Sequence, residues 1–155
     1  MRKFLSIIAV MLLAVVSTSC LKHDLEELEV YSENDIVSVQ GVYWRWIGTE
    51  TIPGSGEHQV LQKEMNVRDS KLDKEAATLS FKYQIPSNFP KDQVNQVTAS
   101  KLVVILNISP AAVIEPVEGA PRLGAPGDWS KPNKYKVTAA DGSAKVWTVS
   151  VSKAQ

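Results

Sequence analysis

Apolar and polar residues alternate with a period of two along most of this chain, and this alternation limits the fold more than any other feature. Successive side chains of a β-strand point to opposite faces, so the pattern predicts strands with one buried face. Residues 77–85 show it clearly, with Leu79, Phe81 and Tyr83 on one side. No apolar stripe with helical spacing is sustained, and the chain is therefore predicted to be all-β.

The clearest local pattern lies near the C-terminus and predicts a β-hairpin. Asp141-Gly142 separates two alternating runs, and an Asp-Gly pair in this position is a strong hairpin signal because both turn residues adopt positive φ. The inward residues are expected to be Tyr135, Val137 and Ala139 before the turn and Trp147, Val149 and Val151 after it.

The first strand, expected over residues 35–47, changes its inward parity partway along. Its apolar residues are Val37 and Val39 at odd positions, then Val42, Trp44 and Trp46 at even ones. The switch falls at Gln40-Gly41. A glycine at such a switch predicts a β-bulge, in which one extra residue restores the inward face.

The other segments complete a set of about six or seven short strands, which fits a two-sheet β-sandwich, with a small barrel as the alternative. A strand is expected at 59–68, with Lys63, Met65 and Val67 on one side. Another is expected at 101–108, where both parities are apolar, as in a central strand. Connecting segments are expected at 51–57, at 69–75, and at 109–132 with a short strand at 112–116.

The N-terminus has the layout of a secretory signal peptide. Arg2 and Lys3 precede an apolar run from Phe4 to Val16, and the small residues 17–19 lead directly to Cys20. The run has 13 residues. A helix that crosses a bilayer needs about 20. A cleaved signal peptide over residues 1–19 is therefore favoured over a permanent membrane span.

Cys20 is the only cysteine, so no intramolecular disulfide can form, and a lone thiol in an exported protein needs an explanation. Residues 16–20, VSTSC, resemble the lipobox of bacterial lipoproteins, with Ser17 where leucine is commonest. The resemblance implies that Cys20 is lipidated and holds the protein to a membrane, expected to be the outer membrane, on a side that the sequence leaves open. The alternative is ordinary cleavage that leaves a free thiol.

The charge balance argues against nucleic acid as a partner. The chain has 17 basic and 17 acidic residues, and removal of residues 1–19 takes away two basic residues and no acidic one, which leaves a net charge of −2. Acidic residues gather in 20–33, which we interpret as a tether. Residues 34–155 suffice for one domain with a single core.

The C-terminal third resembles an immunoglobulin-like domain of unknown function that is common in lipoproteins of the Bacteroides group. Residues 128–151, DWSKPNKYKVTAADGSAKVWTVSV, are similar to the phrase DFSNPVTYTVTAEDGSTKTYTVTV of those domains. A preceding phrase is matched by Ser109-Pro110, Val113, Pro116 and Gly119. The resemblance implies an immunoglobulin-like β-sandwich in the cell envelope, and it brings no catalytic residues with it.

Tyr43 and Arg45 are the first candidates for ligand binding. They belong to the segment YWRW, in which alternation directs Trp44 and Trp46 toward the core and the two candidates toward the opposite face. An aromatic ring on such a face can stack on the apolar side of a sugar ring. A plain solvated face is the alternative.

Trp129 is the third candidate. It lies in the proline- and glycine-rich segment, and an aromatic side chain on a loop can serve as a ligand platform. The family resemblance favours the alternative, in which this side chain plugs the end of the sandwich.

No pattern for catalysis or metal binding is found in the sequence. His23 and His58 are the only histidines, and neither has neighbouring ligands at metal spacing. Carboxylate pairs such as Asp69 and Asp73 are the basis of a minority hypothesis, a small hydrolase. We therefore expect no enzyme activity, no metal and no cofactor.

Two function hypotheses follow. The first is a non-catalytic binding or accessory lipoprotein of the envelope that captures glycans, by analogy with lipoproteins linked to glycan uptake. The second is a structural or adhesive module that docks onto a partner protein through an edge strand or the proline-rich segment.

Overall fold

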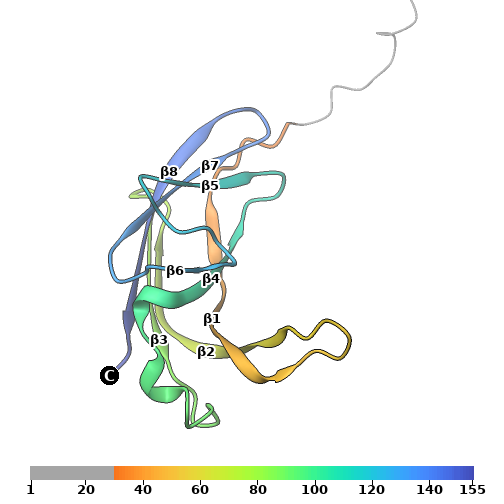
Figure 1. Cartoon of the computed structure of the whole chain (residues 1–155). Helices are drawn as coiled ribbons and strands as arrows, with labels where there is room; N and C mark the ends of the chain where they lie inside the picture. Colours follow the sequence, from red (N-terminus) through yellow and green to blue (C-terminus); the bar gives the residue numbers. More distant parts are fainter. Residues whose placement is uncertain (1–29) are drawn as a thin grey trace, which may run out of the picture. The chain divides into compact units, whose positions relative to one another are not determined.

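The computed structural model describes residues 30–155 (Figure 1). The predicted signal peptide and Cys20 lie outside these residues. Tyr31–Gln155 form one compact unit, which begins three residues before the predicted domain boundary at residue 34. Among the residues described, no helix is long and apolar enough to cross a membrane.

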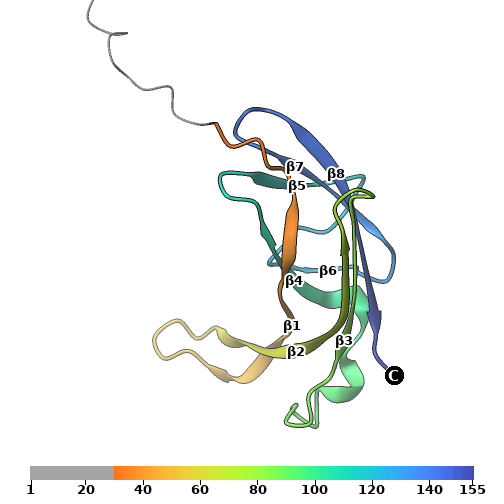
Figure 2. The same ribbon diagram turned by 180° about the vertical axis from the view of Figure 1, so that it is seen from behind.

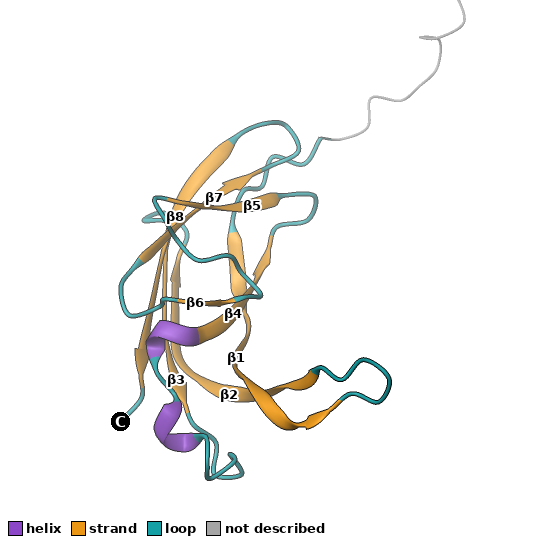
Figure 3. Cartoon of the chain, viewed as in Figure 1, coloured by secondary structure: helices purple, strands orange, loops and turns teal. Residues whose placement is uncertain are grey.

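Eight strands make up this unit, and the all-β prediction is confirmed. They are β1 (Ile36–Thr51), β2 (His58–Asp73), β3 (Thr78–Gln84), β4 (Leu102–Ile108), β5 (Val113–Val117), β6 (Pro126–Gly127), β7 (Asn133–Thr138) and β8 (Ala144–Lys153). Two short 3₁₀ helices, η1 (Val94–Gln96) and η2 (Ala99–Lys101), precede β4 (Figure 3).

The strands form one curled sheet with the order β5-β7-β8-β3-β2-β1-β4-β6 (Figures 1 and 2). The long strand β2 joins its two halves, because residues 58–65 pair with β1 and residues 66–73 pair with β3. Sequence reasoning predicted two separate sheets, whereas this shared strand links all eight by hydrogen bonds. All pairs are antiparallel except β3 with β8.

The core fills the inside of the curl. The predicted inward residues of β3 and β7 are buried there, as are Trp147 and Val149 of β8, while Val151 is only partly buried. β4 is buried on both faces, as expected of a central strand. The largest fully buried side chains are Trp129, Trp147, Tyr135, Phe81, Ile36, Leu79, Leu102, Val42, Val103, Val104, Val137 and Val149.

The predicted bulge in β1 is confirmed. The pairing of β1 with β4 shifts register between Val39 and Gly41. A second shift, between Ile36 and Ser38, was not predicted, and it buries Ile36 and leaves Val37 47% exposed. The inward orientation expected for Val37 is therefore wrong.

The charged connection predicted at residues 69–75 is also wrong, because β2 continues to Asp73. A register shift between Arg68 and Lys71, with Asp69 at a φ of 49°, marks a bulge inside the strand. The turn begins at Asp73, whose Oδ1 accepts hydrogen bonds from the backbone N–H groups of Glu75 and Ala76.

The C-terminal hairpin is confirmed as β7 and β8, but its turn differs from the expected two-residue type. The N–H of Ala139 donates to the carbonyl of Ser143, and the N–H of Gly142 donates to the carbonyl of Ala139. Only Gly142 has positive φ, at 87°. The loop therefore has three residues and needs its glycine at the last of them.

Candidate functional site

A two-stranded ribbon, residues 45–65, extends from the rest of the unit (Figures 1 and 3). β1 is paired with β4 only as far as Trp44, and β2 is paired with β3 only from Asn66 onward. Between these points the two strands pair only with each other, so both outer edges of the ribbon have no neighbouring strand within residues 30–155.

The predicted candidates Tyr43 and Arg45 lie on one face at the base of this ribbon. The register pairs Tyr43 with Glu64, Arg45 with Gln62, and Ile47 with Val60. Directly opposed residues share a face, and alternate residues along a strand return to it. We call this surface the ribbon face, and it consists of Tyr43, Arg45, Ile47, Val60, Gln62 and Glu64.

The ribbon face changes from polar to apolar along its length. Arg45 donates a hydrogen bond from Nη2 to Oε1 of Gln62 at 3.2 Å, and it has no ion pair within residues 30–155. Further out, Ile47 and Val60 are 72% and 65% exposed. Sequence reasoning found Tyr43 and Arg45 but missed this apolar pair, because the partner strand and its register cannot be read from the residues around Ile47.

Tyr43 is held in place by a neighbour that lacks a side chain. A Cβ added at Gly41 would lie 2.7 Å from Cε2 and Oη of Tyr43, so the ring occupies the space above this glycine. The side chain is half-buried as a result. Gly41 therefore makes room for the ring in addition to its place at the bulge.

The tryptophans of the YWRW segment face the other way, as the alternation predicted. Trp44 is buried and donates from Nε1 to Oε1 of Gln93 at 3.3 Å, while Trp46 is partly buried against the core. Leu61 pairs with Trp46 and is 39% exposed. The ribbon thus presents exposed apolar side chains on both faces, with Leu61 on this face and Ile47 and Val60 on the other.

Trp129 lies apart from Tyr43 and Arg45, inside the core. It has no exposed surface, and its ring stacks on Tyr135 with centroids 5.9 Å apart and an interplanar angle of 15°. Burial raises the pKa of Tyr135, whose hydroxyl donates to the carbonyl of Pro121 at 2.8 Å. A ligand cannot reach the buried ring of Trp129 in this conformation, and the packing role is the one that its surroundings support.

A hollow of about 520 Å³ opens where β1 and β2 separate. It adjoins the ribbon face through Glu64, the cross-strand partner of Tyr43. Its polar lining residues are Gln40, Lys63, Glu64, Asn66, Arg68 and Asn88. Sequence reasoning missed them because they come from three separate segments that only the divergence of the two strands brings together.

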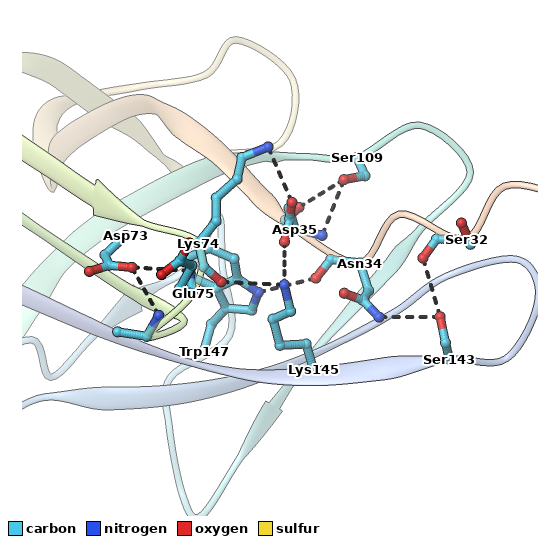
Figure 4. Close-up of polar contacts among 11 residues, drawn as sticks. Ser32, Asn34, Asp35, Asp73, Lys74, Glu75, Ser109, Ser143, Lys145 and Trp147 are labelled. Atoms are coloured by element: carbon cyan, nitrogen blue, oxygen red, sulfur yellow. Dashed lines mark hydrogen bonds and ion pairs between the residues drawn. The ribbon is translucent and has the colours of Figure 1, made fainter.

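A second polar cluster surrounds Asp35 (Figure 4). Its Oδ1 lies 2.7 Å from Nζ of Lys145 and its Oδ2 lies 3.2 Å from Nζ of Lys74, while its backbone N–H donates to Oγ of Ser109. The hydrogen bond from Lys145 and the charge of both lysines hold the pKa of Asp35 below its usual value. Both oxygens of the carboxylate are paired with a lysine, and the cluster joins four segments of the chain, so we interpret it as structural.

The segment before β1 is fastened to the turn between β7 and β8 (Figure 4). The carbonyl of Tyr31 accepts from the N–H of Asp141, and the carbonyl of Ser32 accepts from Oγ of Ser143. Nε1 of Trp147 donates to the carbonyl of Asn34 at 3.1 Å. The last residues of the predicted tether are therefore part of the folded unit.

The carboxylates considered for hydrolysis have different partners. Asp69 forms an ion pair with Lys82 at 2.9 Å, and Asp73 caps the turn that follows it. His58 begins β2 at an exposed position. Within residues 30–155 there is no group of three His, Cys, Asp or Glu side chains that could hold a metal ion.

These features define a small all-β domain whose most exposed apolar residues lie on a projecting ribbon. The family described as DUF5018-related matches residues 36–150, and the chain belongs to this family. The expected domain of unknown function is thereby confirmed.

A solved structure supports the same relationship. The chain is similar to a protein from Bacteroides fragilis NCTC 9343, described provisionally as secreted, with 34% sequence identity and a TM-score of 0.71. The match covers 82% of this chain and 100% of the other. A comparison with curated proteins finds no match.

Proposed function

We propose that this protein is a non-catalytic docking module of the bacterial cell envelope, which binds another envelope protein through the ribbon face. The observation that carries the proposal is the exposed pair Ile47 and Val60 on a ribbon whose two edges have no neighbouring strand within residues 30–155. In this proposal residues 1–19 direct export and lipid on Cys20 anchors the protein to the outer membrane. The secreted description of the Bacteroides fragilis relative supports the export step.

The chemistry of the ribbon indicates the kind of partner. Full burial of an isoleucine or valine side chain stabilises a complex by about 1.5–3 kcal/mol, so the apolar pair favours a partner with apolar side chains. Arg45 and Glu64 have no ion pairs within residues 30–155, and they favour opposite charges across the interface. Either free edge can also accept a strand of the partner.

The test replaces Ile47 by a photo-crosslinking amino acid in the native host. A discrete crosslinked product is expected, and it should disappear when Val60 is changed to Asp. The matched control places the same crosslinker at Val113, which is 60% exposed on β5. A product of equal intensity from both positions, or one that survives Val60→Asp, would count against docking through the ribbon.

A second candidate function is glycan capture at the base of the ribbon. It is favoured by one specific arrangement, in which Tyr43 lies beside a hollow of sugar size that is lined by amide and charged side chains. A glycan array with soluble residues 21–155, followed by titration of tryptophan fluorescence, tests it. A saturable hit that Tyr43→Ala abolishes supports capture, and a hit that Tyr43→Ala leaves intact excludes this site.

A further inference from the structure

The bulge in β2 opens a second surface, on the outer side of β2, β3 and β8. Two hollows of about 490 and 570 Å³ lie here, and they share Asp69 and Lys82. Neither of these hollows is lined by a residue of the ribbon face. One residue, Arg68, lines both the larger of them and the hollow where β1 and β2 separate.

Strand register arranges the polar residues of this surface in rows. One row places Lys71 beside Ser80 and Ser80 beside Ser150. The next row places Arg68 beside Lys82 and Lys82 beside Ser152. In β3 and β8 residues of one face recur at every second position, and in β2 the bulge between Arg68 and Lys71 keeps these two residues opposite Lys82 and Ser80. The six side chains therefore form a grid on the solvent side of the sheet.

The grid combines positive charge with free hydroxyl groups. Arg68, Lys71, Lys82 and Lys153 line the two hollows, against the single side-chain carboxylate of Asp69. Asp69 is paired with Lys82, which leaves the other three cations without an ion pair within residues 30–155. Ser70, Ser80, Ser150 and Ser152 surround the first hollow and make no side-chain hydrogen bond to other described residues.

We infer that this surface binds an acidic polysaccharide, one that carries carboxylates on its sugar rings. The cations pair with the carboxylates, and serine hydroxyls can both donate to and accept from the sugar hydroxyls. The extended grid suits a polymer that lies across several strands. None of the exposed large apolar side chains in residues 30–155 lines either hollow, so the surface has nothing to insert into a lipid layer.

The experiment measures binding of the full chain, kept soluble in detergent, to immobilised polygalacturonate, amylose and polyglutamate. Polygalacturonate should bind saturably, with an affinity that falls as salt rises because the charges are exposed. Amylose has sugar hydroxyls but no charge, so it tests whether hydroxyls alone are enough for binding. Polyglutamate has carboxylates but no sugar, so it tests whether charge alone is enough. Equal binding of polyglutamate and polygalacturonate would overturn the inference, as would no binding of polygalacturonate.

Variants locate the site. Lys71→Glu should weaken polygalacturonate binding about fivefold to tenfold, since it reverses one exposed charge. Lys91→Glu makes the same charge change outside both hollows and should leave the affinity unchanged. Ser80→Ala combined with Ser150→Ala keeps every charge and should lower the affinity for polygalacturonate but not for polyglutamate.

A result in which Lys71→Glu and Lys91→Glu act equally would show a diffuse charge effect and refute the site. Tyr43→Ala should leave this binding intact, because Tyr43 lines neither hollow. That variant also separates this inference from glycan capture at the ribbon.

Discussion

Asp35 and Lys145 are 110 positions apart in the sequence, yet Oδ1 of Asp35 lies 2.7 Å from Nζ of Lys145. The pair fixes the residue before β1 against the strand β8, and Lys145 also lies over the ring of Trp147, 5.6 Å from its centroid. Lys74 reaches the same carboxylate from the turn between β2 and β3. One partly buried carboxylate thus connects both ends of the folded unit.

Asp35→Asn is expected to lower the free energy of unfolding by about 1 kcal/mol at pH 7, because it removes the charge that pairs with Lys145 and Lys74. The loss stays small because Lys74 is exposed, and solvent screens its share of the interaction. The folded pKa of Asp35 is depressed, so the stabilisation is complete above the usual pKa of 3.8 and is lost as the pH falls through the lower folded value. Urea unfolding at pH 7 and pH 3 measures this. If the free energies of unfolding of the wild-type protein and the Asp35→Asn variant differed by the same amount at both pH values, this prediction would be contradicted.

Trp147→Phe should cost more stability than Trp129→Phe, although both rings are fully buried. Nε1 of Trp147 donates to the carbonyl of Asn34, and this variant leaves that carbonyl without its partner. Nε1 of Trp129 has no hydrogen-bond partner among the described residues, so its loss removes only volume. The free energies of unfolding obtained from denaturant titrations should differ by about 1 kcal/mol between the variants. Equal losses of stability in the two variants would show that the hydrogen bond of Trp147 contributes nothing beyond the packing of its ring.

Gly41→Ala is expected to destabilise the domain by about 1 kcal/mol, because the new methyl group would push aside the half-buried ring of Tyr43. Adding Tyr43→Ala should recover part of this loss. A double-mutant cycle on thermal unfolding measures the coupling between the two residues. Additive effects would place the cost in the backbone of the bulge instead.

Ile47→Asp should leave the melting temperature nearly unchanged, since this side chain is exposed and surface substitutions usually change stability by less than about 0.5 kcal/mol. Val42→Asp is the matched control on the same strand, and it should unfold the domain because Val42 is fully buried. Scanning calorimetry compares them. A large loss for Ile47→Asp would mean that Ile47 is packed in solution.

Much of the fold could be predicted because it depends on local alternation. Leu79, Phe81, Tyr83 and the C-terminal hairpin are buried as expected, and the bulge at Gly41 could be located from a change of parity. The extension of β2 through residues 69–73 could not, because the charged side chains there resemble a loop while pairing with β3 keeps the strand extended.

The candidate site was predictable only in part, because only some of its features depend on the pattern within a single strand. The orientation of Tyr43 and Arg45 follows from alternation within one strand. The ribbon depends on where β4 and β3 stop pairing, and the hollows depend on register between distant strands. The burial of Trp129 depends on its contact with Tyr135, which no local pattern encodes.

The fastening of residues 31–35 to the β7–β8 turn has a mechanical consequence. A pull on the chain from the N-terminal side would enter the folded unit at Tyr31 and be shared at once among the contacts of Ser32, Asn34 and Asp35. Beyond them β1 continues between β2 and β4 and ends in the ribbon. The contacts of residues 31–35 would therefore have to break before such a pull reached β1 and the ribbon at its far end.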